Sequence, residues 1–204
     1  MIAPLTRIVF LRPEIPASDT LIFTSQHAVD AFCAIEPARG RRAYCVGAKT
    51  ADGAQAAGFR AVAAGGDAES LLAMILQEHP TGALLHARGE TVARAISHPL
   101  NAAGIETFEA VVYAQRDADL SHEGREVLAR GQPTIVPLFS PQSAVRFFAA
   151  ADDLGASAHV IAISAAVAAR SEGEKCAEIA VASSPDAEAM LDAAATVLCG
   201  LKAG

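Results

Sequence analysis

Hydroxyl-bearing residues stand where a short apolar run gives way to a helical pattern. Thr24 and Ser25 follow the run 20–23, and Ser140 follows the run 134–139. Capping of a helix end alone accounts for many serines and threonines in such positions. In a parallel α/β sheet, however, these junctions share one edge, where unpaired N–H groups and the helix dipole can bind a carboxylate or phosphate. The sequence therefore predicts helix N-termini that bind anions without a basic patch.

The familiar catalytic and cofactor motifs do not occur. The sequence has no G-x-S-x-G, no H-E-x-x-H and no G-x-G-x-x-G after a predicted strand, and Lys49-Thr50 lacks the glycine spacing of a phosphate-binding loop. The four cysteines show no C-x-x-C, so buried structural thiols are favoured over a disulfide framework or a zinc site. His27 stands beside the first helix start, where it could donate to a ligand oxygen. We expect His79, His98 and His122 at the surface.

Composition bounds the class of protein. The 204 residues are 52% hydrophobic and 19% charged, which excludes a disordered chain. A net charge of -7, with no basic run beyond Arg39-Gly40-Arg41-Arg42, argues against nucleic-acid binding. No apolar run is long enough to span a bilayer, and the first residues lack a secretory signal pattern. We therefore expect a cytoplasmic protein with no membrane partner.

The apolar runs alternate with alanine-rich helical patterns, which indicates βαβ units on parallel sheets. The polar stretch 114–123 is the exception, and we interpret it as a linker between two domains, not as a helix. The predicted strands are residues 20–23, 43–46, 61–63, 83–86, 108–113, 134–139, 159–163 and 178–181.

The two halves of the chain resemble each other when one is shifted by about 116 residues. Residues 21–32 align with residues 137–148, with phenylalanine, glutamine and Ala-Val at matching positions. Residues 45–51 align with residues 162–168. This repeat predicts two similar α/β domains.

In their order and spacing, these motifs resemble the uroporphyrinogen-III synthase family of tetrapyrrole biosynthesis. The matching segments are Thr24-Ser25-Gln26-His27-Ala28-Val29, Val46-Gly47-Ala48-Lys49-Thr50-Ala51, Leu85-His86-Ala87-Arg88-Gly89, Gly104-Ile105 leading to Val111-Val112-Tyr113, and Phe139-Ser140-Pro141.

The resemblance implies two three-layer, flavodoxin-like α/β domains with parallel sheets, joined by a two-stranded linker, with the ligand in a cleft between them. It places a linker strand at residues 1–11, the first domain at 12–107, the return strand at 108–116 and the second domain at 117–204. The implied reaction closes the linear tetrapyrrole hydroxymethylbilane to uroporphyrinogen III, with loss of water and inversion of ring D. A monomeric enzyme without metal or organic cofactor is expected.

The resemblance also implies roles for individual residues. Tyr113 matches a tyrosine placed to hydrogen-bond the departing oxygen, and the alternative is an aromatic that only packs in the linker. The substrate-binding positions carried over are Thr24, Ser25, Gln26, His27, Gly47, Lys49, Thr50, Arg88, Gly89, Ser140, Gln142, Ser164 and Ala165. The sequence departs from the family at Val167, which stands where relatives have threonine and cannot donate a hydroxyl.

A second departure lies at the start, where relatives carry a further βα unit that belongs to the sheet of the second domain. We therefore expect a thin second sheet with an exposed edge. Two alternatives to a working synthase stay open, a non-catalytic two-lobed protein that binds a small ligand and an inactive truncated relative of the synthase.

Overall fold

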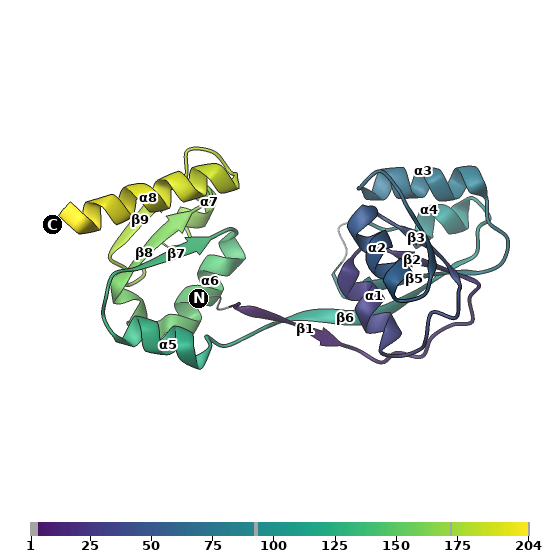
Figure 1. Ribbon diagram of the computed structural model, residues 1–204, viewed down its shortest axis with the longest axis horizontal. Helices are drawn as coiled ribbons and strands as arrows, with labels where there is room; N and C mark the ends of the chain where they lie inside the picture. Colours follow the sequence, from purple (N-terminus) through teal and green to yellow (C-terminus); the bar gives the residue numbers. More distant parts are fainter. Residues whose placement is uncertain (1–3, 92–93, 172, 204) are drawn as a thin grey trace. The chain divides into compact units, whose positions relative to one another are not determined.

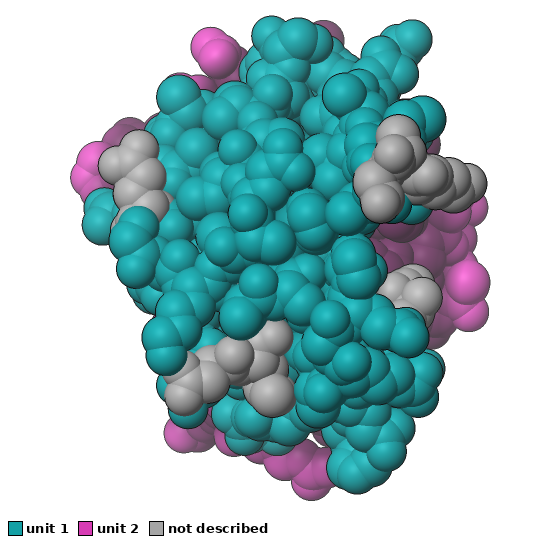
Figure 2. All heavy atoms as spheres, turned by 90° about the vertical axis from the view of Figure 1, so that its left-hand side faces the viewer, with its two compact units in different colours: residues 1–7, 117–204 teal, residues 8–116 magenta. Residues whose placement is uncertain are grey.

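Short apolar runs form parallel strands, and the alanine-rich stretches form helices that cover both faces of each sheet (Figure 1). This computed structural model describes residues 4–91, 94–171 and 173–203. The chain divides into an N-terminal unit, residues 8–116, and a C-terminal unit, residues 1–7 with 117–204; Figure 2 colours them separately. The predicted class, α/β with parallel sheets in three layers, is confirmed.

The N-terminal unit is built on a six-stranded sheet of order β1-β6-β5-β2-β3-β4. Strands β2 to β6 run parallel, and the order of the strands reverses direction between β2 and β5. The elements are β1 (Thr6–Phe10), β2 (Thr20–Phe23), α1 (Gln26–Cys33), β3 (Arg42–Cys45), α2 (Ala48–Ala56), β4 (Arg60–Ala63), α3 (Ala68–Glu78), β5 (Leu84–Gly89), α4 (Ser97–Ala102) and β6 (Thr107–Asp117).

Strands β1 and β6 both cross the boundary between the two units and lie side by side (Figure 1). The N–H of Leu11 donates to the Val112 carbonyl oxygen over 2.8 Å, and the N–H of Ala118 donates to that of Leu5 over 3.0 Å. These two bonds make β1 antiparallel to β6.

Helices α1 and α2 cover one face of the larger sheet, and α3 and α4 cover the other. The first core layer contains Phe23, Phe32 and Phe59, with the rings of Phe23 and Phe59 edge to face at 5.2 Å. The second contains Ile22 and Leu71. Because β2 is buried on both faces, three apolar residues follow Thr20 without alternating with polar ones.

The C-terminal unit has a three-stranded parallel sheet of order β7-β8-β9. Phe147 and Phe148 fill the core on one face, and Met190 of the last helix covers the other. The elements are α5 (His122–Ala129), β7 (Thr134–Leu138), α6 (Pro141–Ala151), the 3-10 helix η1 (Asp152–Ser157), β8 (Ala158–Ala162), α7 (Ala165–Ala168), β9 (Glu178–Val181) and α8 (Ala187–Ala203).

The sequence repeat corresponds to matching helix starts in the two units. Ser25 caps α1 and Ser140 caps α6, both in extended backbone, with φ of -156° and -157°. Each hydroxyl accepts the N–H of the residue three positions on, Ala28 at 3.2 Å and Ser143 at 3.0 Å. Gly47 of α2 and Ser164 of α7 form a second matching pair, with φ of -157° in both.

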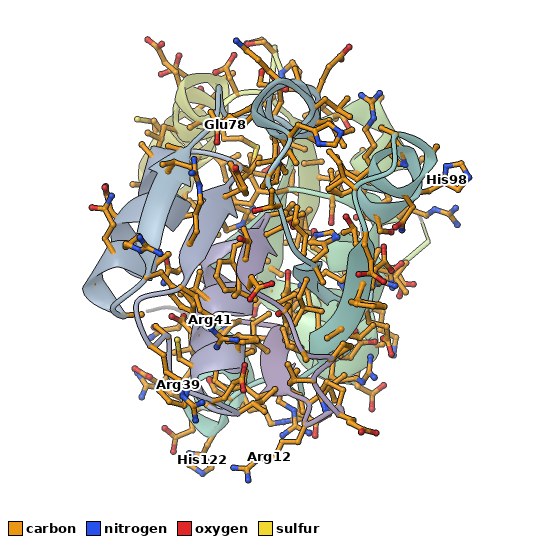
Figure 3. The ribbon with its side chains drawn as sticks, turned by 90° about the vertical axis from the view of Figure 1, so that its right-hand side faces the viewer. Arg12, Arg39, Arg41, Glu78, His98 and His122 are labelled. Carbon is orange, nitrogen blue, oxygen red and sulfur yellow. The ribbon has the colours of Figure 1, made fainter. Side chains whose placement is uncertain are left out.

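Two local expectations were wrong. The stretch 114–123 is not a linker throughout, because β6 continues to Asp117 and α5 begins at His122. The expected buried thiols are found only at Cys45, whereas Cys33 and Cys176 are half-buried and Cys199 is exposed. His79, His98 and His122 are exposed as predicted, and Figure 3 shows the last two projecting from the surface.

His86 of β5 is the buried histidine of the N-terminal unit, at 1% exposure. Among the described residues neither of its ring nitrogens has a hydrogen-bond partner. Burial lowers the pKa of His86 to about 4; the Glu109 carboxylate opposes this shift and the Arg88 cation adds to it. The folded state therefore holds His86 neutral at a pH where the unfolded chain is protonated.

We expect His86 to make the N-terminal unit sensitive to acid. Between its ordinary pKa of 6.5 and about 4, the unfolded chain binds a proton that the folded chain does not. The free energy of unfolding should therefore fall as the pH drops, by about 2 kcal/mol between pH 7 and pH 5. Urea denaturation at both pH values should show this loss, and His86→Leu should remove it. The exposed His98→Gln is the control, and an unchanged pH dependence in His86→Leu would contradict the assignment.

We also expect the smaller sheet to open more readily. β8 and β2 are both central strands with mostly buried residues, but β8 has one neighbour on each side and both of those neighbours are edge strands. Amide hydrogen exchange should therefore be faster in β8 than in β2. Comparing two central strands removes the ordinary effect of an edge. Equal protection would mean that three strands suffice to hold this sheet closed.

Candidate functional site

Several of the sequence-predicted residues gather where the strand order of the N-terminal unit reverses. Thr24 and Ser25 follow β2, Arg88 and Gly89 end the neighbouring strand β5, and Tyr113 lies on β6 beside them. In open parallel sheets, ligands bind outside the carboxyl ends of the strands at such a reversal. The fold thus brings residues from three separate segments to one edge.

A hydrogen bond joins Ser25 and Tyr113, 88 residues apart in sequence. Their hydroxyl oxygens are 3.0 Å apart, and either can be the donor. Ser25 Oγ also accepts the N–H of Ala28, 3.2 Å away, so one hydroxyl both caps α1 and holds the tyrosine. The exposed His27 ring packs edge to face against Tyr113, with the centroids 5.8 Å apart.

Arg88 is occupied by partners on the other face of the sheet. Its Nε donates to Glu109 Oε2 over 2.8 Å, and Ser97, at the start of α4, donates to the second carboxylate oxygen. Burial opposes ionisation of Glu109, yet these hydrogen bonds hold its pKa below the ordinary value. Since α4 lies opposite α1, this network points the guanidinium away from the pair formed by Ser25 and Tyr113.

The neighbouring helix α2 begins at the same edge. Gly47 is its N-cap and provides no side-chain acceptor, while Lys49 is exposed and Thr50 is buried, at 7% exposure. Gln26 donates from Nε2 to Asp30 Oδ1 over 2.9 Å. Of this group, the backbone of the first turn of α2 and the Lys49 side chain can reach a ligand.

The four sites predicted in the C-terminal unit lie at the carboxyl ends of β7 and β8. Ser140 forms a reciprocal capping box with Ser143, so its hydroxyl is committed to the helix end. Gln142 and Ala165 are exposed. Ser164 is half-buried and its side chain makes no capping bond to the short helix α7.

Sequence reasoning missed the residues that surround Arg88. Glu109 pairs with its guanidinium, Ser97 donates to the Glu109 carboxylate, and Arg116 pairs with Glu90 just beyond the end of β5. A charged residue inside the apolar run 107–112 was the signal that could have found Glu109. The residues that the structure describes contain no group of three His, Cys, Asp or Glu side chains placed to bind a metal ion.

Comparison with known families decides what this arrangement belongs to. The family model described as Uroporphyrinogen-III synthase HemD matches residues 1–192. The chain belongs to the uroporphyrinogen-III synthase family. Enzymes of this family are lyases of haem biosynthesis, and their substrate is a tetrapyrrole.

Solved synthase structures resemble this chain in fold. The uroporphyrinogen-III synthetase of Helicobacter pylori 26695 is 20% identical, with a TM-score of 0.62 over 95% of this chain and 91% of that one. A mutant uroporphyrinogen III synthase of the extreme thermophile Thermus thermophilus is 15% identical, with a TM-score of 0.43 over 98% of this chain and 88% of that one. No curated protein matches the sequence significantly. In the part of the synthase chain that is described, no helix is both long and apolar enough to cross a bilayer.

We expect the Ser25 hydroxyl to serve two roles that substitution can separate. Ser25→Ala and Ser121→Ala each remove a serine N-cap, and each should lower the free energy of unfolding by about 1 kcal/mol. Only Ser25→Ala also removes a partner of Tyr113. Because the chain has two tyrosines and no tryptophan, this loss should alter the tyrosine fluorescence. Identical spectra for the two variants would argue against the hydrogen bond.

Proposed function

We propose that this chain is a working synthase that closes hydroxymethylbilane to uroporphyrinogen III, with Tyr113 as its catalytic residue. The single observation that carries the proposal is the hydrogen bond of Tyr113 to Ser25 at the reversal of strand order. The family membership of the chain supplies the class of substrate.

Either hydroxyl can be the donor in the bond between Ser25 and Tyr113, and the proposed mechanism uses the direction in which the serine donates. Ser25 Oγ accepts the Ala28 N–H, which leaves the serine proton available to the Tyr113 oxygen. The tyrosine proton is then free to hydrogen-bond the hydroxymethyl oxygen that leaves the substrate as water. As that oxygen departs, the phenol oxygen gains negative charge, and the serine proton stabilises it. The histidine ring of His27 limits the movement of the phenol.

The carboxylates of the substrate suit helix N-termini better than cationic side chains on this acidic protein. The caps of α2 and α7, Gly47 and Ser164, make no side-chain bond to the first turn in the described structure. Their helix ends therefore keep N–H groups available for an anion. We assign substrate binding to the residues around these helix ends and their neighbours, namely Thr24, Ser25, Gln26, His27, Gly47, Lys49, Thr50, Arg88, Gly89, Ser140, Gln142, Ser164 and Ala165. For Arg88, Gly89 and Ser140 the assignment is to backbone groups, because the Arg88 guanidinium and the Ser140 hydroxyl already have partners in the structure.

A cytoplasmic monomer without nucleic-acid or membrane partners completes the proposal. The ion pairs in the basic run 39–42 support the absence of a nucleic-acid partner, because Arg41 pairs with Glu36 and Arg42 pairs with Glu78. Figure 3 shows Arg39 and Arg41 close together near the surface. With two of these cations paired, the run offers little net charge to a phosphate backbone. The sedimentation of the purified chain measures its mass in solution and so tests whether it is a monomer.

Incubation with hydroxymethylbilane separates the synthase from a binding protein or an inactive relative. The substrate closes by itself to the type I isomer, so a chain that only binds it yields that isomer. A synthase yields the type III isomer in excess. Chromatography of the oxidised products therefore tests the function directly, and type I product alone would refute it.

We expect Tyr113→Phe to lower turnover by roughly ten- to a thousandfold, since it removes the proton that assists departure of the oxygen. The fold should persist, because the ring still packs beside His27. Tyr44→Phe is the matched control: Tyr44 is fully buried and donates to Glu78, away from the site, so its loss should affect stability and spare turnover. Unchanged turnover in Tyr113→Phe would remove Tyr113 from the mechanism.

A further inference from the structure

The side chain of Tyr113 reaches Ser25 only because the pairing of β5 with β6 is irregular. Arg88 pairs with Val111 and Gly89 pairs with Tyr113, so the register skips Val112. Side chains alternate between the faces of a strand, and Val112 and Tyr113 should therefore point to opposite faces. Instead, Val112 is buried in the core layer beneath α1, and Tyr113 packs against the same layer. The extra residue redirects the tyrosine to the face on which Ser25 lies.

The space that the redirected ring occupies is left open by Gly89. A Cβ atom at Gly89 would lie 2.7 Å from Tyr113 Cζ, 2.9 Å from its hydroxyl oxygen and 3.0 Å from Cε2. Real Cβ atoms essentially never approach other heavy atoms below 3.0 Å. Gly89 itself is buried, and its backbone does not adopt the positive φ that would call for glycine. The reason for glycine at this position is therefore space for the ring.

Backbone contacts hold the two strands together at this point. The N–H of Glu90 donates to the Tyr113 carbonyl oxygen over 2.9 Å, directly after the irregularity. Arg116 donates from both of its terminal nitrogens to the Glu90 carboxylate. The backbone is also paired before Gly89, between Arg88 and Val111. With β5 held on both sides, a methyl group at position 89 would have to be accommodated by movement of the tyrosine ring.

We propose that Gly89, together with the bulge at Val112, is a positioning residue that sets the Tyr113 hydroxyl against Ser25. The inference rests on the proposed function for its catalytic consequence, and on geometry alone for the placement of the ring. A methyl group at position 89 displaces the phenol, breaks its hydrogen bond to Ser25 and misaligns the proton donor.

Gly89→Ala tests the catalytic consequence. We expect kcat to fall about tenfold to a hundredfold while KM changes less than about threefold, because the donor moves and the helix ends that bind carboxylates do not. In the Tyr113→Phe background the same substitution should change kcat less than about threefold, since no phenol proton is left to misalign. Gly200→Ala adds a methyl group in open space on α8 and is the matched control. Equal losses of kcat in both backgrounds would overturn the proposal.

A second measurement tests the placement without any turnover. In a Tyr44→Phe background the tyrosine fluorescence comes from Tyr113 alone, and Gly89→Ala should make it more accessible to acrylamide.

Thermal unfolding gives an independent test. Gly89→Ala should lower the midpoint of thermal unfolding, and in a Tyr113→Ala background, where the ring is gone, it should not. If Gly89→Ala does not fold, a folded Tyr113→Ala/Gly89→Ala variant still supports the proposal, and an unfolded one overturns it. A wild-type chain that makes only type I product would refute the proposed function and leave this coupling intact.

Discussion

The N–H groups at the start of each helix need acceptors, and this requirement organises both units of the chain. Parallel strands deliver their helices to one edge of the sheet, so the unpaired groups collect there. The chain satisfies some of them itself, through Ser25 on α1 and Ser140 on α6. At the starts of α2 and α7, whose N-caps are Gly47 and Ser164, the N–H groups have no side-chain acceptor from the cap residue. The same edge thus combines helix ends that the chain caps itself with helix ends whose N–H groups have no side-chain acceptor, and the latter are what the proposed binding of carboxylates requires.

At this edge, the hydroxyl of Ser25 both caps α1 and hydrogen-bonds Tyr113. Ser25 cannot leave Tyr113 without also disturbing the first turn of α1, because a single oxygen serves both. The arrangement restricts the tyrosine without burying it completely. On the other face of the sheet, Glu109 forms an ion pair with Arg88 and accepts a hydrogen bond from Ser97. On the face covered by α1, the link between Ser25 and Tyr113 is a neutral hydrogen bond. The ion pair with Glu109 keeps the Arg88 cation away from the face on which Tyr113 and Ser25 lie.

The features that the sequence predicted are those set by local chemistry. The serines that cap α1 and α6 could be identified because a cap needs only the following three residues. The strands could be identified because burial on both faces makes them mostly apolar, as in the run 21–23 of β2. The contact of Gly89 with Tyr113 and the partners of Arg88 depend on register between β5 and β6, which local pattern does not determine. The polar residues 115–117 looked like a loop because β6 leaves the covered part of the sheet after the buried Ala114, and exposed strand residues need not be apolar.

The repeat also explains a departure from the family that at first looks damaging. The resemblance to the family implies a threonine where this chain has Val167, and the aligned residue of the other unit is Thr50. Both side chains are buried, at 1% and 7% exposure, on the inward side of the first turn of α7 and α2. A residue in that position packs against the core, and the N–H of Val167 donates to the Ser164 carbonyl oxygen over 3.0 Å. Replacing a hydroxyl by a methyl group there changes packing far more than it changes the set of donors. The two units can therefore diverge at this position while the backbone of their helix ends, with Gly47 and Ser164 in the same extended conformation, stays alike.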